Sequence, residues 1–262
     1  MTLTPERADE LAAALYKARL TRVPVPPLTE ADPDLTMADG YLVQQGVVRR
    51  YLADGDRIVG YKLGLTSKPM QTMLGVDSPD FAPVMASHVN VDGTAIEVSS
   101  FIAPKLEAEI ALVLGAELSG PDCTPLNVLR ATDGVVASIE LVDSRVADWR
   151  IKLPDTVADM ASSGAIVVAG RATAVSDVDL RTLGMVFTRD GEVIATGAGA
   201  AALGNPAAAV AWLVRTLHPL GAGLHAGSVV MTGALHAAVP VAAGETYRAE
   251  FDRLGAVSVR IV

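Results

Sequence analysis

Near the N-terminus, apolar residues recur at the spacing of an amphipathic helix. Leu11, Leu15 and Ala18 form one stripe, and Thr4 offers a capping hydroxyl just before a proline. A proline at the first helical position fits the fixed φ of the helix, so we expect a helix over residues 5–20.

A second stripe follows after a proline-rich stretch. Residues 23–33 carry several prolines and predict an extended connector. Thr36 and Asp39 then have the spacing of a capping box, and Tyr41 and Val48 share one face of the segment that follows. This pattern predicts a second helix that ends near residue 52.

Beyond residue 56 the pattern changes to short runs rich in Val and Ile, separated by Gly, Asp and Pro, which is typical of strands. Asp190-Gly191 supplies the positive φ angles of a tight hairpin turn between residues 185–188 and 193–196. Further strands are expected at 58–63, 107–114, 135–142, 228–232, 246–252 and 256–261.

One helix interrupts the strands. Asn205-Pro206 is a cap followed by a first-turn proline, and apolar residues continue at helical spacing until Gly221. The chain therefore predicts an α+β protein, with a helical N-terminal cap over 1–55 and a mostly β core over 56–262 that together form one continuous structural unit.

Three glutamates stand out on two of the expected strands. Because strand side chains alternate, Glu107 and Glu109 share a face at a spacing of about 7 Å, opposite Ala108 and Ile110. Glu140 is the single charge in the apolar run 135–142, and the same alternation places it on one face of that expected strand. An exposed sheet face is one interpretation, but burying like carboxylates costs several kcal/mol unless a cation is bound. A hard divalent cation such as Mg²⁺ binds oxygen ligands of this kind.

The overall charge narrows the classes of partner. A formal charge of -9 and a pI near 4.9 leave no basic patch for phosphate backbones, so we expect no nucleic-acid partner. Residues 197–214 are nearly uncharged but are interrupted by Asn205-Pro206, so we expect no membrane span. With Cys123 as the single cysteine and no N-terminal signal pattern, we expect a cytoplasmic protein.

Other catalytic patterns have little support. The four histidines are scattered without a zinc-binding spacing, which favours surface or loop positions for each. Residues 197–202 match a loose dinucleotide fingerprint, but the following helix starts too late and no acidic residue lies about twenty positions on. No serine has the nucleophile-elbow pattern, and Cys123 is expected to be an incidental loop thiol.

Several motifs resemble one family over nearly the whole chain. They lie at residues 60–67, 75–81, 104–110, 138–145, 155–159, 203–206 and 231–233. Together they are similar to the 2-hydroxypenta-2,4-dienoate (2-keto-4-pentenoate) hydratases and 4-oxalocrotonate decarboxylases of the fumarylacetoacetate hydrolase superfamily.

The resemblance implies a mixed β-roll core of the fumarylacetoacetate hydrolase C-terminal type, Mg²⁺ or Mn²⁺ as cofactor, and a homo-oligomer that could associate with a neighbouring pathway enzyme. By position, the metal ligands are Glu107, Glu109 and Glu140. Lys62 and Asp80 match active-site residues, and Ser162 matches an active-site hydroxyl. A lysine near a metal and partly buried is expected to have its pKa lowered toward neutrality.

The expected reaction is metal-dependent addition of water to a 2-hydroxy-2,4-dienoate, with decarboxylation of a 4-oxalocrotonate-type acid as the alternative. Other members of the superfamily are tautomerases or C–C hydrolases. One departure matters, because Met160 stands where the family usually has an asparagine. It leaves open a third interpretation, a non-catalytic subunit that binds metal and 2-oxo acids beside an active homologue.

Overall fold

The structure, a computed structural model, describes residues 3–262, with the side chains of Met73 and Leu74 excepted. Its helices are α1 (Pro5–Thr21), α2 (Leu28–Ala31), α3 (Met37–Ala53), α4 (Lys68–Leu74), α5 (Pro125–Ala131), α6 (Leu153–Ala158) and α7 (Pro206–Leu217). Its strands are β1 (Ile58–Gly64), β2 (Asp80–Met85), β3 (Val89–Val91), β4 (Ala95–Ile96), β5 (Lys105–Leu114), β6 (Thr132–Val142), β7 (Ser163–Val168), β8 (Gly184–Arg189), β9 (Glu192–Ala198), β10 (Val229–Ala234), β11 (Val239–Pro240), β12 (Thr246–Phe251) and β13 (Gly255–Ile261).

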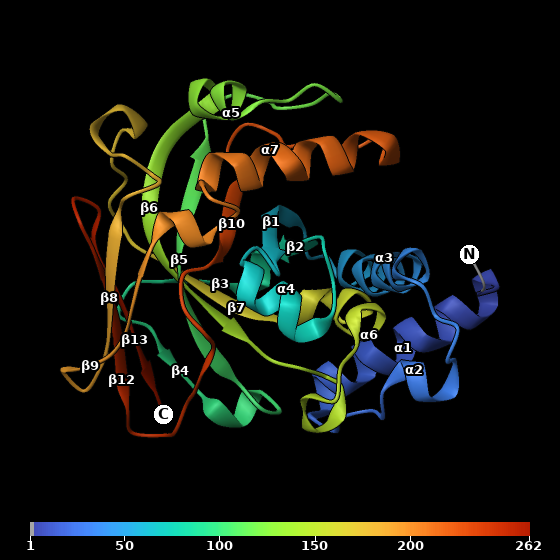
Figure 1. Cartoon of the computed structure of the whole chain (residues 1–262). Helices are drawn as coiled ribbons and strands as arrows, with labels where there is room; N and C mark the ends of the chain where they lie inside the picture. The colour runs from blue at the N-terminus through green and yellow to red at the C-terminus, as the bar shows by residue number, and fades with distance from the viewer. Residues whose placement is uncertain (1–2) are drawn as a thin grey trace.

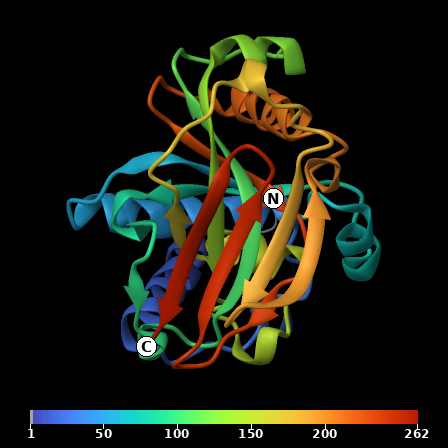
Figure 2. The ribbon, with the colours of Figure 1, turned by 90° about the vertical axis from the view of Figure 1, so that its left-hand side faces the viewer.

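The strands form two sheets. One has the order β2-β1-β10-β5-β6-β7-β3, with β11 added beside β5, and it mixes parallel and antiparallel pairs. The other has the order β4-β13-β12-β8-β9 and faces the viewer in Figure 2. Strands β12 and β13 contact β6, so the two sheets pack on each other.

The main hydrophobic core lies between these layers. The even-numbered residues of β5, among them Ile110 and Leu112, are fully buried and belong to one cluster with α7 and the inner faces of β12 and β13. Helix α7 lies across one end of the large sheet and contacts β10 and α5 (Figure 1). The odd-numbered face of β5 is thereby left for the functional groups described below.

The N-terminal helices gather on the side of the molecule away from the smaller sheet (Figure 1). Helix α3 contacts both α1 and α6. A second hydrophobic cluster joins residues of α1 and α3, such as Leu15 and Val43, to Met85 on β2 and to Met160. The helical region thus packs directly on the segments that surround the candidate site.

The main sequence expectations for the fold are confirmed. The class is α+β with a helical N-terminal region, Thr4, Thr36 and Asn205 cap their helices, and Asp190-Gly191 adopts positive φ angles in the β8–β9 hairpin. The prediction of an extended connector over residues 23–33 was wrong in part, because Leu28–Ala31 forms the short helix α2. Within the described residues, the helices are all too short or too polar to cross a membrane. The division of the chain into 1–55 and 56–262 stays a prediction.

Candidate active site

Three carboxylates meet on adjacent strands of the large sheet. Glu107 on β5 pairs in register with Glu140 on β6, and Glu109 pairs with Ser138. One carboxylate oxygen from each glutamate lies within 4.8 Å of the others. Strand alternation is the physical reason, since it turns residues two apart toward the same face.

The surroundings of these carboxylates favour a cation. Glu109 and Glu140 are 0% exposed, and among the described residues no donor reaches Glu109 Oε1 or Glu140 Oε1. Burial and then the neighbouring Glu140 raise the pKa of Glu107 to about 7, and burial raises the pKa of the other two as well. Unpaired buried carboxylates are costly, so this donor set fits a hard divalent cation.

Lys62 on β1 is the cationic side chain closest to the cluster. It is 3% exposed, its Nζ donates to the carbonyl oxygen of Ala161 at 2.8 Å, and it lies 3.3 Å from Glu140 Oε2. Burial lowers the pKa of Lys62, but four surrounding carboxylates raise it, and the net shift is upward. The expectation of a pKa near neutrality concerns a lysine beside a bound metal and stays a prediction.

Asp80 reaches the same place from the start of β2. It pairs in register with Gly64, and a Cβ on Gly64 would lie 2.1 Å from Asp80 Oδ1 and 3.5 Å from Lys62 Nζ. The absence of a side chain at Gly64 is what lets these two functional groups approach. Burial raises the pKa of Asp80, and the charge of Lys62 acts in the opposite direction.

Ser162 belongs to an unusual turn between α6 and β7. Met160, Ala161 and Ser162 have φ angles of 55°, 49° and 55°, a left-handed run that non-glycine residues rarely adopt. The turn aims the Ala161 carbonyl at Lys62 and places Ser162 Oγ 3.3 Å from Thr156 Oγ1. Strain of this kind is retained where the surrounding structure fixes it.

A cavity of about 920 Å³ opens over these groups. Lys62, Asp80, Glu107 and Ser162 line it, while Glu109 and Glu140 are fully buried beside it. Much of the remaining wall comes from residues 63–71 of the β1–α4 segment and from residues 200–204 and 234–238. The structure thus brings together the residues singled out in the sequence, around a space that admits a small organic acid.

Residues 59–262 match the family model described as fumarylacetoacetate (FAA) hydrolase C-terminal. This chain belongs to that family. It is 42% identical to the 2-keto-4-pentenoate hydratase of Paraburkholderia xenovorans (strain LB400), over 97% of this chain and 95% of that protein. It is 41% identical to the 4-oxalocrotonate decarboxylase of Pseudomonas sp. (strain CF600), over 100% of this chain and 99% of the relative.

A solved member of the family has nearly the same structure. The 4-oxalocrotonate decarboxylase from Pseudomonas putida G7, complexed with magnesium and adipate, superimposes with a TM-score of 0.97 at 40% identity, covering 100% of this chain and 99% of that one. The resemblance inferred from the motifs is confirmed, and it includes the N-terminal helices that precede the matched family region.

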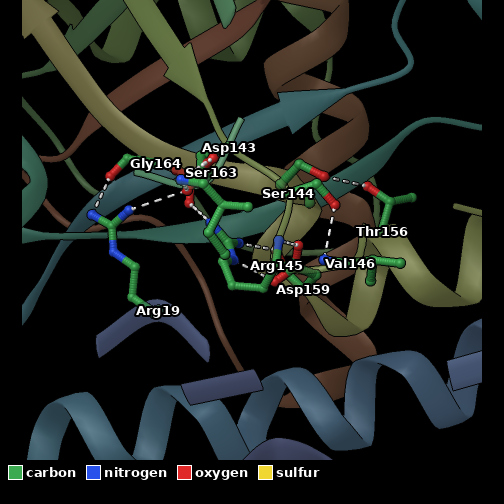
Figure 3. Close-up of polar contacts among 12 residues, drawn as sticks. Arg19, Asp143, Ser144, Arg145, Val146, Thr156, Asp159, Ser163 and Gly164 are labelled. Carbon is green, nitrogen blue, oxygen red and sulfur yellow. Dashed lines mark hydrogen bonds and ion pairs between the residues drawn. The ribbon is translucent and has the colours of Figure 1, made fainter. Parts of the chain in front are cut away.

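In the present structure, a buried ion pair between Arg145 and Asp159 supports the strained turn (Figure 3). Arg145 donates from Nη1 to the carbonyl oxygen of Ser163 at 2.7 Å, and its side chain also pairs with the Asp159 carboxylate and carbonyl oxygen. The Arg145 amide donates to Asp159 Oδ2 at 2.8 Å. Both flanks of the turn are tied to one arginine, which explains how three left-handed residues are held in place.

Met160 is the first residue of this turn and is not among the residues that line the cavity. Its side chain is 3% exposed and packs with the N-terminal hydrophobic cluster that joins α1, α3 and β2. A thioether at this position therefore contacts apolar side chains of the helical region rather than the contents of the cavity.

Of two notable histidines, His88 differs from expectation, whereas His236 lies in a loop as expected. His88 is buried against the edge of the Tyr51 ring, and burial lowers its pKa to about 3, so its assignment to a surface or loop was wrong. His236 borders the cavity, and its Nε2 accepts from the Ala108 amide at 2.9 Å while its Nδ1 lies 2.7 Å from the Ala237 carbonyl oxygen. Both ring nitrogens are thus engaged with backbone, which suits a wall residue.

Sequence reasoning missed several groups at the site. Arg145 and Asp159 lie in motifs that carry the resemblance, but their pairing and the role of the Ala161 carbonyl could not be predicted, because both depend on a turn that only the folded chain shows. Lys105 and Trp149 also line the cavity, although neither was a candidate. For Lys105 a signal existed, since it precedes Glu107 and Glu109 at the same two-residue spacing.

Proposed function

We propose that this chain is a Mg²⁺- or Mn²⁺-dependent lyase that adds water to a 2-hydroxy-2,4-dienoate of the 2-keto-4-pentenoate type, giving a 4-hydroxy-2-oxo acid. One observation carries the proposal. Three carboxylate ligand atoms lie within 4.8 Å of one another beside a cavity, with the buried Lys62 3.3 Å from one of them.

Glu107, Glu109 and Glu140 are the residues that would hold the metal. The unpaired oxygens of Glu109 and Glu140 and the upward pKa shifts of all three carboxyl groups support this assignment. When bound, the cation would supply Lewis acidity that stabilises negative charge on the 2-oxygen of the substrate.

Lys62 and Asp80 are the proposed proton-transfer groups. The Nζ of Lys62 donates to the Ala161 carbonyl oxygen and lies 3.3 Å from Glu140 Oε2 at the cavity wall. Lys62 is therefore proposed to donate a proton to C5 of the dienol and to regain the proton that leaves the enol hydroxyl as the 2-oxo group forms. In the second step the hydroxyl of a water adds at C4 and its proton goes to C3, with Asp80 placed to accept and return that proton.

Ser162 is proposed to bind the substrate. Its Oγ is buried at the cavity wall within 3.3 Å of Thr156 Oγ1, so these two hydroxyls form a short polar strip in a largely apolar space. Such a strip orients a hydrogen-bonding group of a small acid.

Decarboxylation of a 4-oxalocrotonate-type acid is the second candidate. It is favoured by the solved relative with a TM-score of 0.97, a decarboxylase complexed with magnesium and adipate. A cation held by the same three glutamates would then supply the Lewis acidity that stabilises the electron pair left at the substrate when a distal carboxylate departs as CO₂.

The third interpretation, a non-catalytic subunit, rested on Met160. Because that side chain packs into the N-terminal cluster, the feature that motivated this interpretation is explained by packing. A cytoplasmic location, a homo-oligomer and association with a neighbouring pathway enzyme stay predictions.

The deciding experiment supplies Mg²⁺ with 2-hydroxypenta-2,4-dienoate and, separately, with 2-oxohex-3-enedioate, follows ultraviolet absorbance, and identifies the products by NMR. Formation of 4-hydroxy-2-oxopentanoate from the first substrate supports the hydratase. Release of CO₂ from the second supports the decarboxylase. Absence of turnover with both, under conditions where oxalate binds in a Mg²⁺-dependent way, would contradict both reactions.

A further inference from the structure

Among the described residues, the ladder that β5 forms with β10 and β11 is interrupted beside the acidic cluster. Strand β10 pairs with β5 as far as Ala234, which lies opposite Glu109. Pairing resumes where Val239 of β11 lies opposite Leu106. The interruption falls at Ala108, which is 0% exposed. A buried backbone amide without a partner is costly, so the Ala108 amide needs an acceptor from elsewhere.

The segment that joins β10 to β11 supplies this acceptor from a side chain. The Leu235 amide donates to the Ala108 carbonyl oxygen at 3.0 Å, as a strand residue would. The Ala108 amide donates to Nε2 of His236 at 2.9 Å. An imidazole nitrogen therefore takes the place of a strand carbonyl in the ladder. It does so at the one residue that separates Glu107 from Glu109.

The His236 ring is fixed on its other sides as well. Its Nδ1 lies 2.7 Å from the Ala237 carbonyl oxygen, and because Nε2 accepts, Nδ1 carries the proton and donates there. The ring stacks on Phe187 of β8, with centroids 4.7 Å apart and planes at 28°. Phe187 stacks in turn on Tyr247 of β12, 5.9 Å away. Two strands of the smaller sheet therefore support the ring that contacts β5.

The same connecting segment also contacts a proposed metal ligand directly. The Gly233 amide donates to Glu109 Oε2 at 2.8 Å. Gly233 has a φ of 109°, and a Cβ there would lie 2.0 Å from a neighbouring hydroxyl oxygen, so this approach requires glycine. Because Glu107 and Glu109 flank Ala108, a shift of the β5 backbone at this point would move both carboxylates.

We propose that His236 is a positioning residue for the metal site, because by accepting from the Ala108 amide it sets the places of the Glu107 and Glu109 carboxylates. His236 borders the cavity, but both of its ring nitrogens are engaged with backbone, so it acts through β5 and not on the substrate. The inference rests on the proposed function and deepens it, since it assumes that these glutamates bind the cation.

The test measures Mn²⁺ binding by calorimetry in the absence of substrate. His236→Leu keeps a side chain of similar size and removes the acceptor. The Mn²⁺ dissociation constant is expected to rise about tenfold or more, the range found when a group that orients metal ligands is removed. An unchanged binding stoichiometry separates weaker binding from loss of folded protein.

Two amide variants form a matched pair that differs in reach. In His236→Gln the side-chain oxygen can occupy the place of Nε2, whereas in His236→Asn it is one methylene shorter and falls short of the Ala108 amide. His236→Gln should keep the Mn²⁺ dissociation constant within about threefold, and His236→Asn should raise it about tenfold. This pair decides the question even where His236→Leu does not fold. His225→Leu, at an exposed position before β10, is the control and should bind Mn²⁺ like the wild type.

Each contrary result has its own meaning. Unchanged Mn²⁺ affinity in His236→Leu and His236→Asn would overturn the positioning role while leaving the metal assignment in place. Equal losses in His236→Gln and His236→Asn would also overturn it, because the acceptor atom would then not matter. A wild type whose Mn²⁺ affinity is unaffected by Glu109→Gln would instead contradict the metal assignment in the proposed function, on which this inference rests.

Discussion

Two halves of one sheet face carry opposite chemistry. On β5, Glu107 and Glu109 occupy one half, and Ala111 and Val113 continue the same alternation into the other. On β6, Glu140 faces Glu107 across the ladder, whereas Val136 faces Ala111. The backbone register is continuous, so side-chain choice alone separates the two halves.

The difference shows what a buried charge requires. The acidic half gathers Lys62 beside Glu140 and leaves carboxylate oxygens without donors among the described residues. The apolar half joins Ala111, Val136 and Met231 in a cluster that needs no counter-charge. We infer that the apolar half stabilises the fold, while the acidic half is costly in the free protein and is repaid when a cation binds.

The largest expected effect comes from removing one charge of the acidic half. Glu109→Gln should lower kcat/KM by about 10³-fold or more, because an amide is a poor ligand for Mg²⁺. The fold should persist, since the Gln carbonyl can still accept from the Gly233 amide that now donates to Glu109 Oε2 at 2.8 Å. Turnover and Mg²⁺ binding by calorimetry check both points. Glu192→Gln, at an exposed position of β9, is the matched control, and unchanged turnover in Glu109→Gln would contradict the assignment.

Replacing Lys62, the cationic side chain of the acidic half, should lower turnover much more than ligand binding. Lys62→Met is expected to lower kcat by about 10²–10³-fold, the range of a proton-transfer group. Binding of oxalate in the presence of Mg²⁺, measured by calorimetry, should change little. Loss of oxalate binding along with turnover would make Lys62 a binding group rather than a proton donor.

A charge placed in the apolar half should lower stability instead of activity. Val136→Asp puts a carboxylate in an apolar cluster where the exposed fraction is 5%, so the free energy of unfolding should fall by about 3 kcal/mol. Urea unfolding measures the loss. Val193→Asp, on a side chain that is 63% exposed, should cost less than about 1 kcal/mol. Equal losses in the two variants would contradict the contrast between the halves.

The smallest expected effect is a pH dependence of metal stabilisation. Upward pKa shifts favour the protonated carboxyls in the folded state, so their contribution to stability is complete below the unfolded pKa near 4.3 and is lost as pH rises toward about 7 for Glu107. Mg²⁺ needs the deprotonated form and should therefore stabilise more at about pH 8 than at about pH 5.5. The difference, about 1 kcal/mol, corresponds to about 2–4 °C in melting temperature. Thermal melts with and without Mg²⁺ test it, and an equal gain at both pH values would be the contrary result.

Local chemistry made much of the fold predictable. Thr4, Thr36 and Asn205 mark helix starts because a capping oxygen acts on the next few residues. A comparable signal at Thr124-Pro125, which begins α5, was overlooked. Strand β2 was also missed, because Pro83 interrupts the pattern, and it is tolerated there since β2 is the edge strand of its sheet.

The candidate site was likewise predictable only in part. The glutamate cluster followed from strand period, and Lys62, Asp80 and Ser162 followed from resemblance. No sequence pattern could predict contacts between residues far apart in the chain. An example is the hydrogen bond from Lys62 to the carbonyl oxygen of Ala161, 99 residues further along. The orientation of Met160 likewise depends on the strained turn and on the helical region that covers it.

The central claim is that Glu107, Glu109 and Glu140 hold the catalytic metal. The most direct test is an anomalous difference map from crystals of the protein grown with Mn²⁺ and oxalate. We predict one strong peak within about 2.1–2.3 Å of an oxygen of each glutamate, with oxalate bound to it on the cavity side. A peak elsewhere, or none near these carboxylates while oxalate is bound in the cavity, would contradict the account.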